Sequence, residues 1–369
     1  MFNVVRNIMR QFRERAFPMI HFATRLDQKL SNIRSGHYKP TDFIIADAKD
    51  GDMGSGLAAT GFERSADGST SRHRTRTEFL DQIRAVVAQD IVDIMLLSAS
   101  NLELLHERGV FHKSRVKPAI RANDTTDCWG GVRHGRYNAH PSRPFRTASI
   151  SRVMYGTSTP TPGGTITGTD LGLYSVTFLN DLEADARALE EFAIFRQEAA
   201  ENDFKYFLEV FNPNIETGMD REAIGEFVND SILRCLAGVT KADRPQFLKI
   251  VYNGPKALEE LASFDPGLVV GVLGGSAGTT RDTFELVHQA ERYGGRVALF
   301  GRKINLAEDP LALLVLMRQV ADGTIASEEA VRAYHGDLAK QGIRPKRGLD
   351  EDRQITENVL KPGLMQKAA

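Results

Sequence analysis

The 369-residue sequence is poor in cysteine and carries almost no excess charge. Its two cysteines, Cys128 and Cys235, lie far apart and form neither a CxxC pair nor a zinc-ligand array. They indicate reduced thiols in a cytoplasmic protein rather than a disulfide framework. The formal net charge of -1 argues against nucleic acid or an anionic membrane as the partner. No apolar run approaches the roughly 20 residues that a membrane-spanning helix needs.

The N-terminal segment MFNVVRNIMRQFRERAF is basic and amphipathic. Organelle-targeting segments share this pattern, but the segment contains Glu14 and is poor in serine. We therefore favour an extra helix that packs on the main domain or on a neighbouring subunit. Residues 1–40 are interpreted as an N-terminal helical extension.

After residue 40, short apolar or β-branched runs alternate with longer helical patterns. Eight such runs are expected to be strands: Phe43–Asp47, Val92–Leu97, Pro118–Ala122, Tyr174–Leu179, Tyr206–Phe211, Phe247–Tyr252, Leu268–Leu273 and Val297–Gly301. This alternation is typical of parallel strands joined by helical crossovers. Eight strands favour an α/β fold of the closed (β/α)₈ type, a TIM barrel, over an open doubly wound sheet. We expect the barrel to span residues 41–325 and a C-terminal helix or tail to span residues 326–369.

Residues 123–170 interrupt the alternation after the third expected strand. The segment is rich in Gly, Pro, Ser and Thr and has no clear helical period. In a barrel it emerges at the C-terminal face, where such enzymes carry their active sites. It is either a lid or subunit arm that helps to hold an anionic substrate, or a solvated insertion that mediates oligomer contacts. Its basic residues include Arg133, His134, Arg136, His140, Arg143, Arg146 and Arg152.

Lys249 lies in the middle of a hydrophobic strand, in the run QFLKIVYNG. Because strand side chains alternate, it points the same way as Phe247 and Val251. Both faces of a barrel strand are buried, and burying an ammonium group without a partner is expensive. Desolvation favours the neutral amine, which is the form that attacks a carbonyl to give a Schiff base. The alternative is a structural lysine that pairs with a carboxylate.

Asp47 ends the first expected strand, in the run DFIIADAKDG. An acid near the C-terminal end of a barrel strand is well placed for proton transfer. Asp47 could instead cap the segment that follows. The neighbouring Lys49 and Asp50 are interpreted as further site residues, with solvated loop charges as the alternative.

Glu209 lies on the fifth expected strand, in the run KYFLEVFNPN. Phe207 and Phe211 flank it at the positions of the same face. If this face points inward, the apolar setting favours the neutral acid and suits an acid/base role. Alternatively, Glu209 is a salt-bridge partner of Lys249.

The last two expected strands end in the glycine-rich turns VLGGSAGTTRDTF and LFGRKIN. Glycine allows backbone N–H groups to approach an anion closely. The loops after strands 7 and 8 of a barrel often form its phosphate site. The turns therefore predict a phosphate cradle made of Gly274, Gly275, Ser276, Gly301 and Arg302.

The order of these motifs resembles the class I aldolase superfamily, which includes archaeal-type fructose-bisphosphate, tagatose-bisphosphate and deoxyribose-phosphate aldolases. The likeness is carried by FLKIVYNGPKALEEL and by VVGVLGGSAGTTRDTFELVHQAERYGGRVALFGRKIN, with IIADAKDG and YFLEVFNPN before them. It implies that Lys249 forms the Schiff base, that Glu209 is an acid/base and that Asp47 contacts substrate hydroxyls. Thr177 stands where the tagatose-bisphosphate branch has a lysine, so we count it with Lys49 among the substrate-binding residues.

The resemblance and the residues together predict a metal-independent class I aldolase that needs no cofactor and acts on a phosphorylated ketose or related sugar. Two alternatives stay open. One is another iminium-based carbon–carbon lyase or transferase, transaldolase-like or thiolase-like. The other is a barrel that binds a sugar phosphate without turnover. The expected partners are a small phosphorylated substrate and, because of the insertion and the N-terminal helix, further copies of the same chain.

Overall fold

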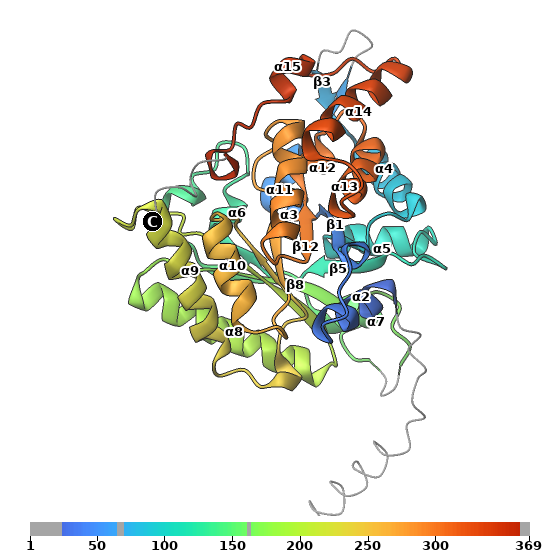
Figure 1. Cartoon of the computed structure of the whole chain (residues 1–369). Helices are drawn as coiled ribbons and strands as arrows, with labels where there is room; N and C mark the ends of the chain where they lie inside the picture. Colours follow the sequence, from blue (N-terminus) through green and yellow to red (C-terminus); the bar gives the residue numbers. More distant parts are fainter. Residues whose placement is uncertain (1–23, 65–69, 161–163, 362–369) are drawn as a thin grey trace, which may run out of the picture.

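The computed structural model describes residues 24–64, 70–160 and 164–361, and its centre is a closed barrel of eight parallel strands (Figure 1). The barrel strands are β1 (Ile44–Lys49), β4 (Ile94–Leu97), β5 (Lys117–Arg121), β8 (Leu171–Thr177), β9 (Lys205–Phe211), β10 (Leu248–Ile250), β11 (Val270–Leu273) and β12 (Val297–Phe300). Each strand pairs with the next in this order, and β12 pairs with β1 to close the barrel. The prediction of a (β/α)₈ barrel is confirmed, and each expected strand overlaps an observed one.

Alternate residues of these strands face the barrel interior and the surrounding helices. The interior cluster takes side chains from all eight strands or from the residue directly before them, including Ile44, Leu96, Phe207 and Leu299. The residues between them, such as Ile45, belong to the outer cluster. Because both faces are buried, the strands read as continuous apolar runs, which is why the sequence reveals them.

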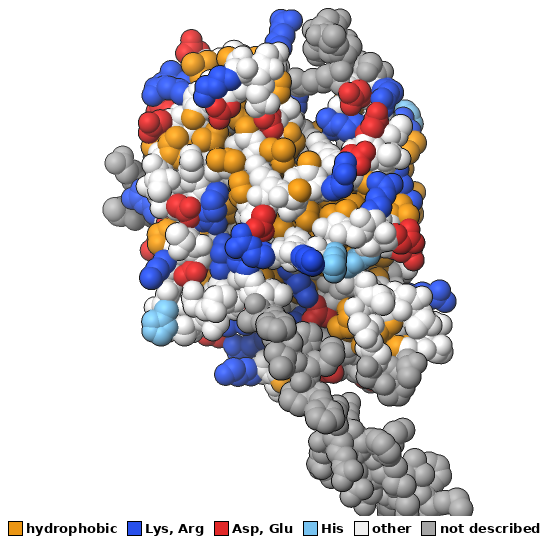
Figure 2. Space-filling model, turned by 90° about the vertical axis from the view of Figure 1, so that its right-hand side faces the viewer, with side chains coloured by type: hydrophobic (Ala, Val, Ile, Leu, Met, Phe, Trp, Pro, Cys, Tyr) orange, Lys and Arg blue, Asp and Glu red, His pale blue; other side chains and the backbone are white. Residues whose placement is uncertain are grey.

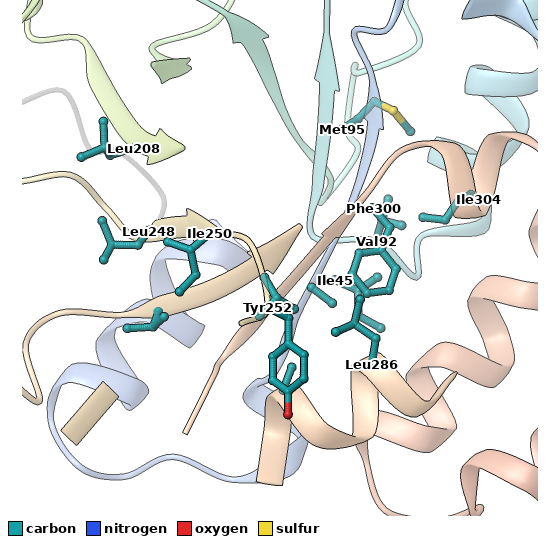
Figure 3. Packing of buried hydrophobic residues seen from close by; sticks show 14 of the residues in the cluster. Ile45, Val92, Met95, Leu208, Leu248, Ile250, Tyr252, Leu286, Phe300 and Ile304 are labelled. Carbon is teal, nitrogen blue, oxygen red and sulfur yellow. The ribbon is translucent and has the colours of Figure 1, made fainter. Parts of the chain in front are cut away.

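The crossover helices surround the barrel (Figure 1). The longer ones are α4 (Arg76–Gln89), α5 (Ala99–Glu107), α8 (Leu182–Glu201), α9 (Arg221–Leu236), α10 (Pro255–Phe264), α11 (Thr280–Arg292) and α13 (Pro310–Ala321). Figure 3 shows part of the apolar layer between helices and strands, with Leu286 from α11 and with Ile45 and Phe300 from the strands. Capping boxes fix where α4 and α11 begin, since Thr75 and Thr279 each accept a hydrogen bond from the backbone three residues on.

Helix α2 (Arg25–Arg34) closes the N-terminal end of the barrel. Leu26 and Leu30 join the interior cluster. Arg25 and Lys29 bind Asp93, a completely buried carboxylate just before β4, at 2.8 and 2.9 Å. The extension therefore contributes a helix that plugs the barrel. The basic helix expected over residues 1–17 lies outside the described residues.

The long segment after β5 contains short regular elements where the sequence suggested none. They are β6 (Asp124–Thr125), α6 (Thr126–Trp129), the 3₁₀ helix Tyr137–Ala139, β7 (Pro144–Phe145) and α7 (Ile150–Tyr155). β6 and β7 form a small antiparallel ladder, and Trp129 stacks on Tyr137 with ring centroids 4.2 Å apart. These elements are too short to give a detectable period in the sequence. The segment after β1 likewise contains α3 (Asp52–Ser55), a 3₁₀ helix (Gly56–Thr60) and the hairpin β2 (Phe62–Arg64)–β3 (Thr70–His73).

The C-terminal part packs against the barrel helices. It consists of α14 (Ser327–Lys340), which contacts α11 and α13, then α15 (Leu349–Asp352) and a 3₁₀ helix (Asn358–Leu360). Acidic and basic side chains are scattered among one another on the face shown in Figure 2, in keeping with the near-zero net charge. No helix within the described residues has the length and apolar character required to span a membrane.

Candidate active site

A cavity of about 580 Å³ opens at the C-terminal end of the barrel. Its walls come from the end of β1 and the turn after it, from the ends of β5, β9 and β10, and from the turns that follow β11 and β12. The 123–170 insertion adds a wall through Asp124, Asp127, Cys128, Gly130, Gly131 and Asn138. This is the end at which barrel enzymes carry their active sites.

A charged network crosses the floor of this cavity. Lys249 and Glu209 are register neighbours on β10 and β9, and the Lys249 Nζ lies 2.5 Å from Glu209 Oε1. Arg121, at the end of β5, places its Nη2 3.1 Å from the other carboxylate oxygen of Glu209 and its Nε 2.5 Å from Asp50 Oδ2. Ser175 of β8 donates its hydroxyl to Glu209 at 2.6 Å. All of these residues are buried, so the network lies in a setting where charge–charge interactions are strong.

The cations of the network keep Asp50 ionised. Burial alone would raise the pKa of the Asp50 carboxyl, but Arg121 and Lys249 outweigh it and hold the pKa below its ordinary value. Burial likewise disfavours the charged form of Arg121, yet Asp50 and Glu209 raise its pKa well above the usual range. Asp50 and Arg121 therefore form a fixed pair of opposite charges beside Lys249.

The setting of Glu209 differs from the apolar one expected from Phe207 and Phe211. The side chain does face inward, but its carboxylate accepts hydrogen bonds from Ser175 and Arg121 and contacts Lys249. The residues before and after Glu209 on its own strand do not reveal which side chains the adjacent strands place beside it. Here the adjacent strands β8 and β10 supply the polar partners Ser175 and Lys249. Polar and charged groups therefore surround the carboxylate of Glu209 in place of the expected apolar setting, and the alternative of a pair with Lys249 describes the observed contact.

Asp47 lies apart from the residues that line the cavity. It shares the strand face of Ile45, which belongs to the outer cluster, and it is completely buried. Its carboxylate binds the Lys49 Nζ at 2.8 Å. Lys49 does line the cavity, but its ammonium group forms an ion pair with Asp47. The acid that the first strand presents to the cavity is Asp50.

The glycine turns face the cavity from the side opposite Arg121. Gly274, Gly275, Gly301 and Arg302 are all among its lining residues. Gly275 has φ +64°, a conformation that favours glycine, and a Cβ on Gly274 would lie 3.1 Å from the Phe300 ring. Arg302 donates to the Gly275 carbonyl at 3.1 Å, so the two turns are joined.

Two predicted substrate contacts lie outside this lining. The Ser276 hydroxyl lies 3.5 Å from Oε1 of Glu357 in the C-terminal segment. The same carboxylate oxygen binds the Lys303 Nζ at 2.7 Å. Thr177 donates to Asp127 Oδ2 at 3.0 Å and thereby ties the insertion to β8. Thr177 thus supports the part of the cavity wall that Asp127 forms, whereas Ser276 contacts the C-terminal segment.

The insertion presents acids to the cavity, whereas none of its basic residues is among the described lining residues. Arg146, for example, pairs with Glu198 on α8 at 2.7 Å. Burial raises the pKa of the Cys128 thiol to about 12, so this cysteine is not poised as a thiolate nucleophile. The described residues contain no cluster of three or more His, Cys, Asp or Glu side chains that could hold a metal ion.

Sequence reasoning missed Arg121, Ser175 and Asp124. The sequence did contain a signal for Arg121. It lies on the same strand face as the interior residue Ala119, just as Lys249 lies on the same face as Phe247. Ser175 is too common a residue type to attract attention. Asp124 begins an insertion whose course the sequence pattern does not predict.

No protein-family model matches this chain, and no curated protein matches it. Solved structures do. One of them is an archaeal fructose-1,6-bisphosphate aldolase with its catalytic Lys covalently bound to the carbinolamine intermediate of the substrate. It is 17% identical to this chain, with a TM-score of 0.56, and the match covers 81% of this chain and 100% of the aldolase chain. The fructose-bisphosphate aldolase from Slackia heliotrinireducens is 12% identical with a TM-score of 0.58, covering 88% and 95%. The resemblance is confirmed at the level of fold: the chain is a barrel built like those of the Schiff-base class I fructose-bisphosphate aldolases.

Proposed function

We propose that this protein is a metal-independent class I aldolase that makes or breaks a carbon–carbon bond in a phosphorylated ketose or related sugar. The observation that carries the proposal is the Lys249–Glu209 contact of 2.5 Å at the floor of a cavity whose rim is formed by two glycine turns. A nucleophile within hydrogen-bond reach of a base is the arrangement that covalent catalysis requires.

Lys249 attacks the substrate carbonyl after giving a proton to Glu209. Glu209 then returns protons as the carbinolamine loses water, and Arg121 and Ser175 hold its second oxygen in place. The resulting iminium is an electron sink that lowers the barrier to breaking the adjacent carbon–carbon bond. Asp50 stays anionic beside it and stabilises the positive charge.

The turns after β11 and β12 bind the phosphate through the backbone of Gly274, Gly275 and Gly301, with Arg302 as the cation. Because β10 and β11 are register neighbours, the phosphate is held next to the carbonyl that meets Lys249. Asp124 and Asp127 lie on the wall of the cavity opposite the glycine turns. Their carboxylates can bind hydroxyl groups of the substrate and repel a second phosphate. The proposed substrate therefore has one phosphate near its carbonyl and an uncharged polyhydroxy tail.

Borohydride trapping tests the proposal. Incubation with a ketose 1-phosphate and borohydride is expected to add the mass of the reduced sugar phosphate to the peptide that contains Lys249. The Lys249→Arg variant keeps the charge but cannot form the imine, so it serves as the matched control. The proposal fails if the wild-type protein forms no adduct across a panel of ketose monophosphates and bisphosphates.

A further inference from the structure

Asp124 is a buried cavity acid whose bonding is incomplete. It is the first residue of β6, three residues after Arg121, and only 2% of its surface is exposed. Its Oδ1 is buried and makes no hydrogen bond to any part of the chain that the structure describes. The nearest cation is Arg121, whose Nη1 lies 3.4 Å from that oxygen. Asp124 is among the residues that line the cavity, and a buried carboxyl oxygen without a hydrogen-bond partner at such a position is a candidate contact for a ligand.

The cations nearest to Asp124 pair mainly with Asp50 and Glu209. Arg121 already contacts Asp50 through Nε and Glu209 through Nη2, and Lys249 contacts Glu209. Among the residues that the structure describes, Asp124 has one ion pair, the longer contact of 3.4 Å to Arg121. Of the charged groups that act on Asp124, Arg121 favours the anion, while Asp50, Glu209 and Asp127 disfavour it. Burial makes the largest contribution to the shift of the Asp124 pKa. The net effect of burial and of these charges raises the pKa to about 7.

The proposed cleavage needs a group that accepts a proton from the substrate hydroxyl as the carbon–carbon bond breaks. Asp50 is held anionic by two cations, which makes it a weak base. Glu209 is occupied by Lys249, Arg121 and Ser175. Asp47 lies outside the cavity lining.

We propose that Asp124 is the general base of the cleavage step and the general acid of the reverse condensation. This inference rests on the proposed aldolase function. In cleavage, the O–H bond of the hydroxyl β to the iminium carbon breaks and its proton goes to Asp124. The oxygen forms a carbonyl, and the electron pair of the broken carbon–carbon bond forms the enamine as the iminium nitrogen becomes neutral. No oxidant, reductant or further reactant is needed.

The insertion therefore contributes a reacting group as well as a wall. The assignment also fits the tail of the substrate, because Asp124 lies on the cavity side opposite the phosphate turns, where the leaving half of a ketose would extend. An acid with a pKa near the working pH is the one that transfers protons most effectively in both directions.

The test compares Asp124→Asn with Asp127→Asn, a control that removes a carboxylate from the same wall. For the wild type, cleavage of a ketose monophosphate is expected to rise with pH through about 7, and condensation to fall over the same range. Asp124→Asn is expected to lose about 100-fold or more in cleavage rate and to lose this pH dependence. Asp127→Asn is expected to keep it, displaced to lower pH because one like charge is gone. Asp124→Glu, which restores a carboxyl group, is expected to recover the pH dependence.

Borohydride trapping separates this inference from the proposed function. If Asp124 acts only in the carbon–carbon step, Asp124→Asn still forms the reduced adduct on Lys249 while cleaving slowly. A variant that cleaves at the wild-type rate with the wild-type pH profile overturns the role of Asp124 and leaves the aldolase proposal standing. A wild-type protein that forms no adduct at all overturns both.

Discussion

Asp124 gives the sharpest stability prediction, because the folded protein holds its carboxyl proton far more tightly than the unfolded chain does. Its pKa rises from 3.8 to about 7 on folding. The folded state therefore binds more protons between these values, and the free energy of unfolding falls as pH rises through them. A shift of about three pKa units corresponds to roughly 4 kcal/mol once the group is ionised in both states. About 2–3 kcal/mol of this is lost between pH 5 and pH 8.

Asp124→Asn removes the titrating group while keeping its size. Urea unfolding of the wild type and the variant at pH 5 and pH 8 is the assay, with the difference between the two pH values compared so that any constant effect of the substitution cancels. The wild type is expected to lose about 2–3 kcal/mol more than the variant over this range. Parallel pH dependences of the two proteins would show that Asp124 is ionised normally and would refute the reasoning.

Three further outcomes follow from contacts in the structure. Glu209→Gln is expected to slow the formation of the borohydride-trapped adduct on Lys249 by about 100-fold, because the proton acceptor is lost. Quench-flow sampling measures the rate of adduct formation, and an unchanged rate contradicts the role of Glu209. Arg302→Ala is expected to raise KM for a phosphorylated substrate about tenfold or more with little change in kcat, since a phosphate contact is the same in ground and transition states. A lower kcat at constant KM would remove Arg302 from the cradle. Asp93→Ala is expected to lower the free energy of unfolding by about 3–5 kcal/mol in urea titrations, because Arg25 and Lys29 lose a buried partner. A loss below about 1 kcal/mol would mean that α2 does not depend on this pair.

The barrel could be predicted from the sequence because parallel strands that are buried on both faces form apolar runs of a recognisable length. The same regularity made Lys249 and Glu209 conspicuous, since each interrupts such a run with a charge. Their contact follows from the pairing of β9 with β10, so two strand positions and a barrel order were enough to bring them together.

Strand parity limited the prediction for the first strand. Asp47 and Asp50 are three residues apart and therefore have opposite parity along an extended chain. Ile44 and Ala46 face the interior, which places Asp47 on the outer face, where Lys49 neutralises it. The sequence alone does not show which alternate residues of this strand face the interior, so it does not show whether Asp47 or Asp50 lines the cavity.

The insertion could not be predicted because its structure depends on side-chain contacts to distant elements rather than on periodicity. Asp127 is fixed by Thr177 on β8 and by Ser142, and Asn214 after β9 accepts from the Ser142 N–H at 3.2 Å. Such single polar contacts leave no pattern in the sequence. They nevertheless decide that the cavity wall formed by the insertion presents carboxylates, and not the basic residues that the lid alternative placed there.

Electron density at Lys249 tests the central claim most directly. A crystal soaked with a ketose 1-phosphate and treated with borohydride is expected to show density that runs without a break from the Lys249 Nζ to the former carbonyl carbon, with the phosphate on the turns at Gly275 and Gly301. An intact sugar phosphate beside Lys249, with no bond to its nitrogen, would contradict Schiff-base catalysis and would favour a barrel that binds its ligand without turnover.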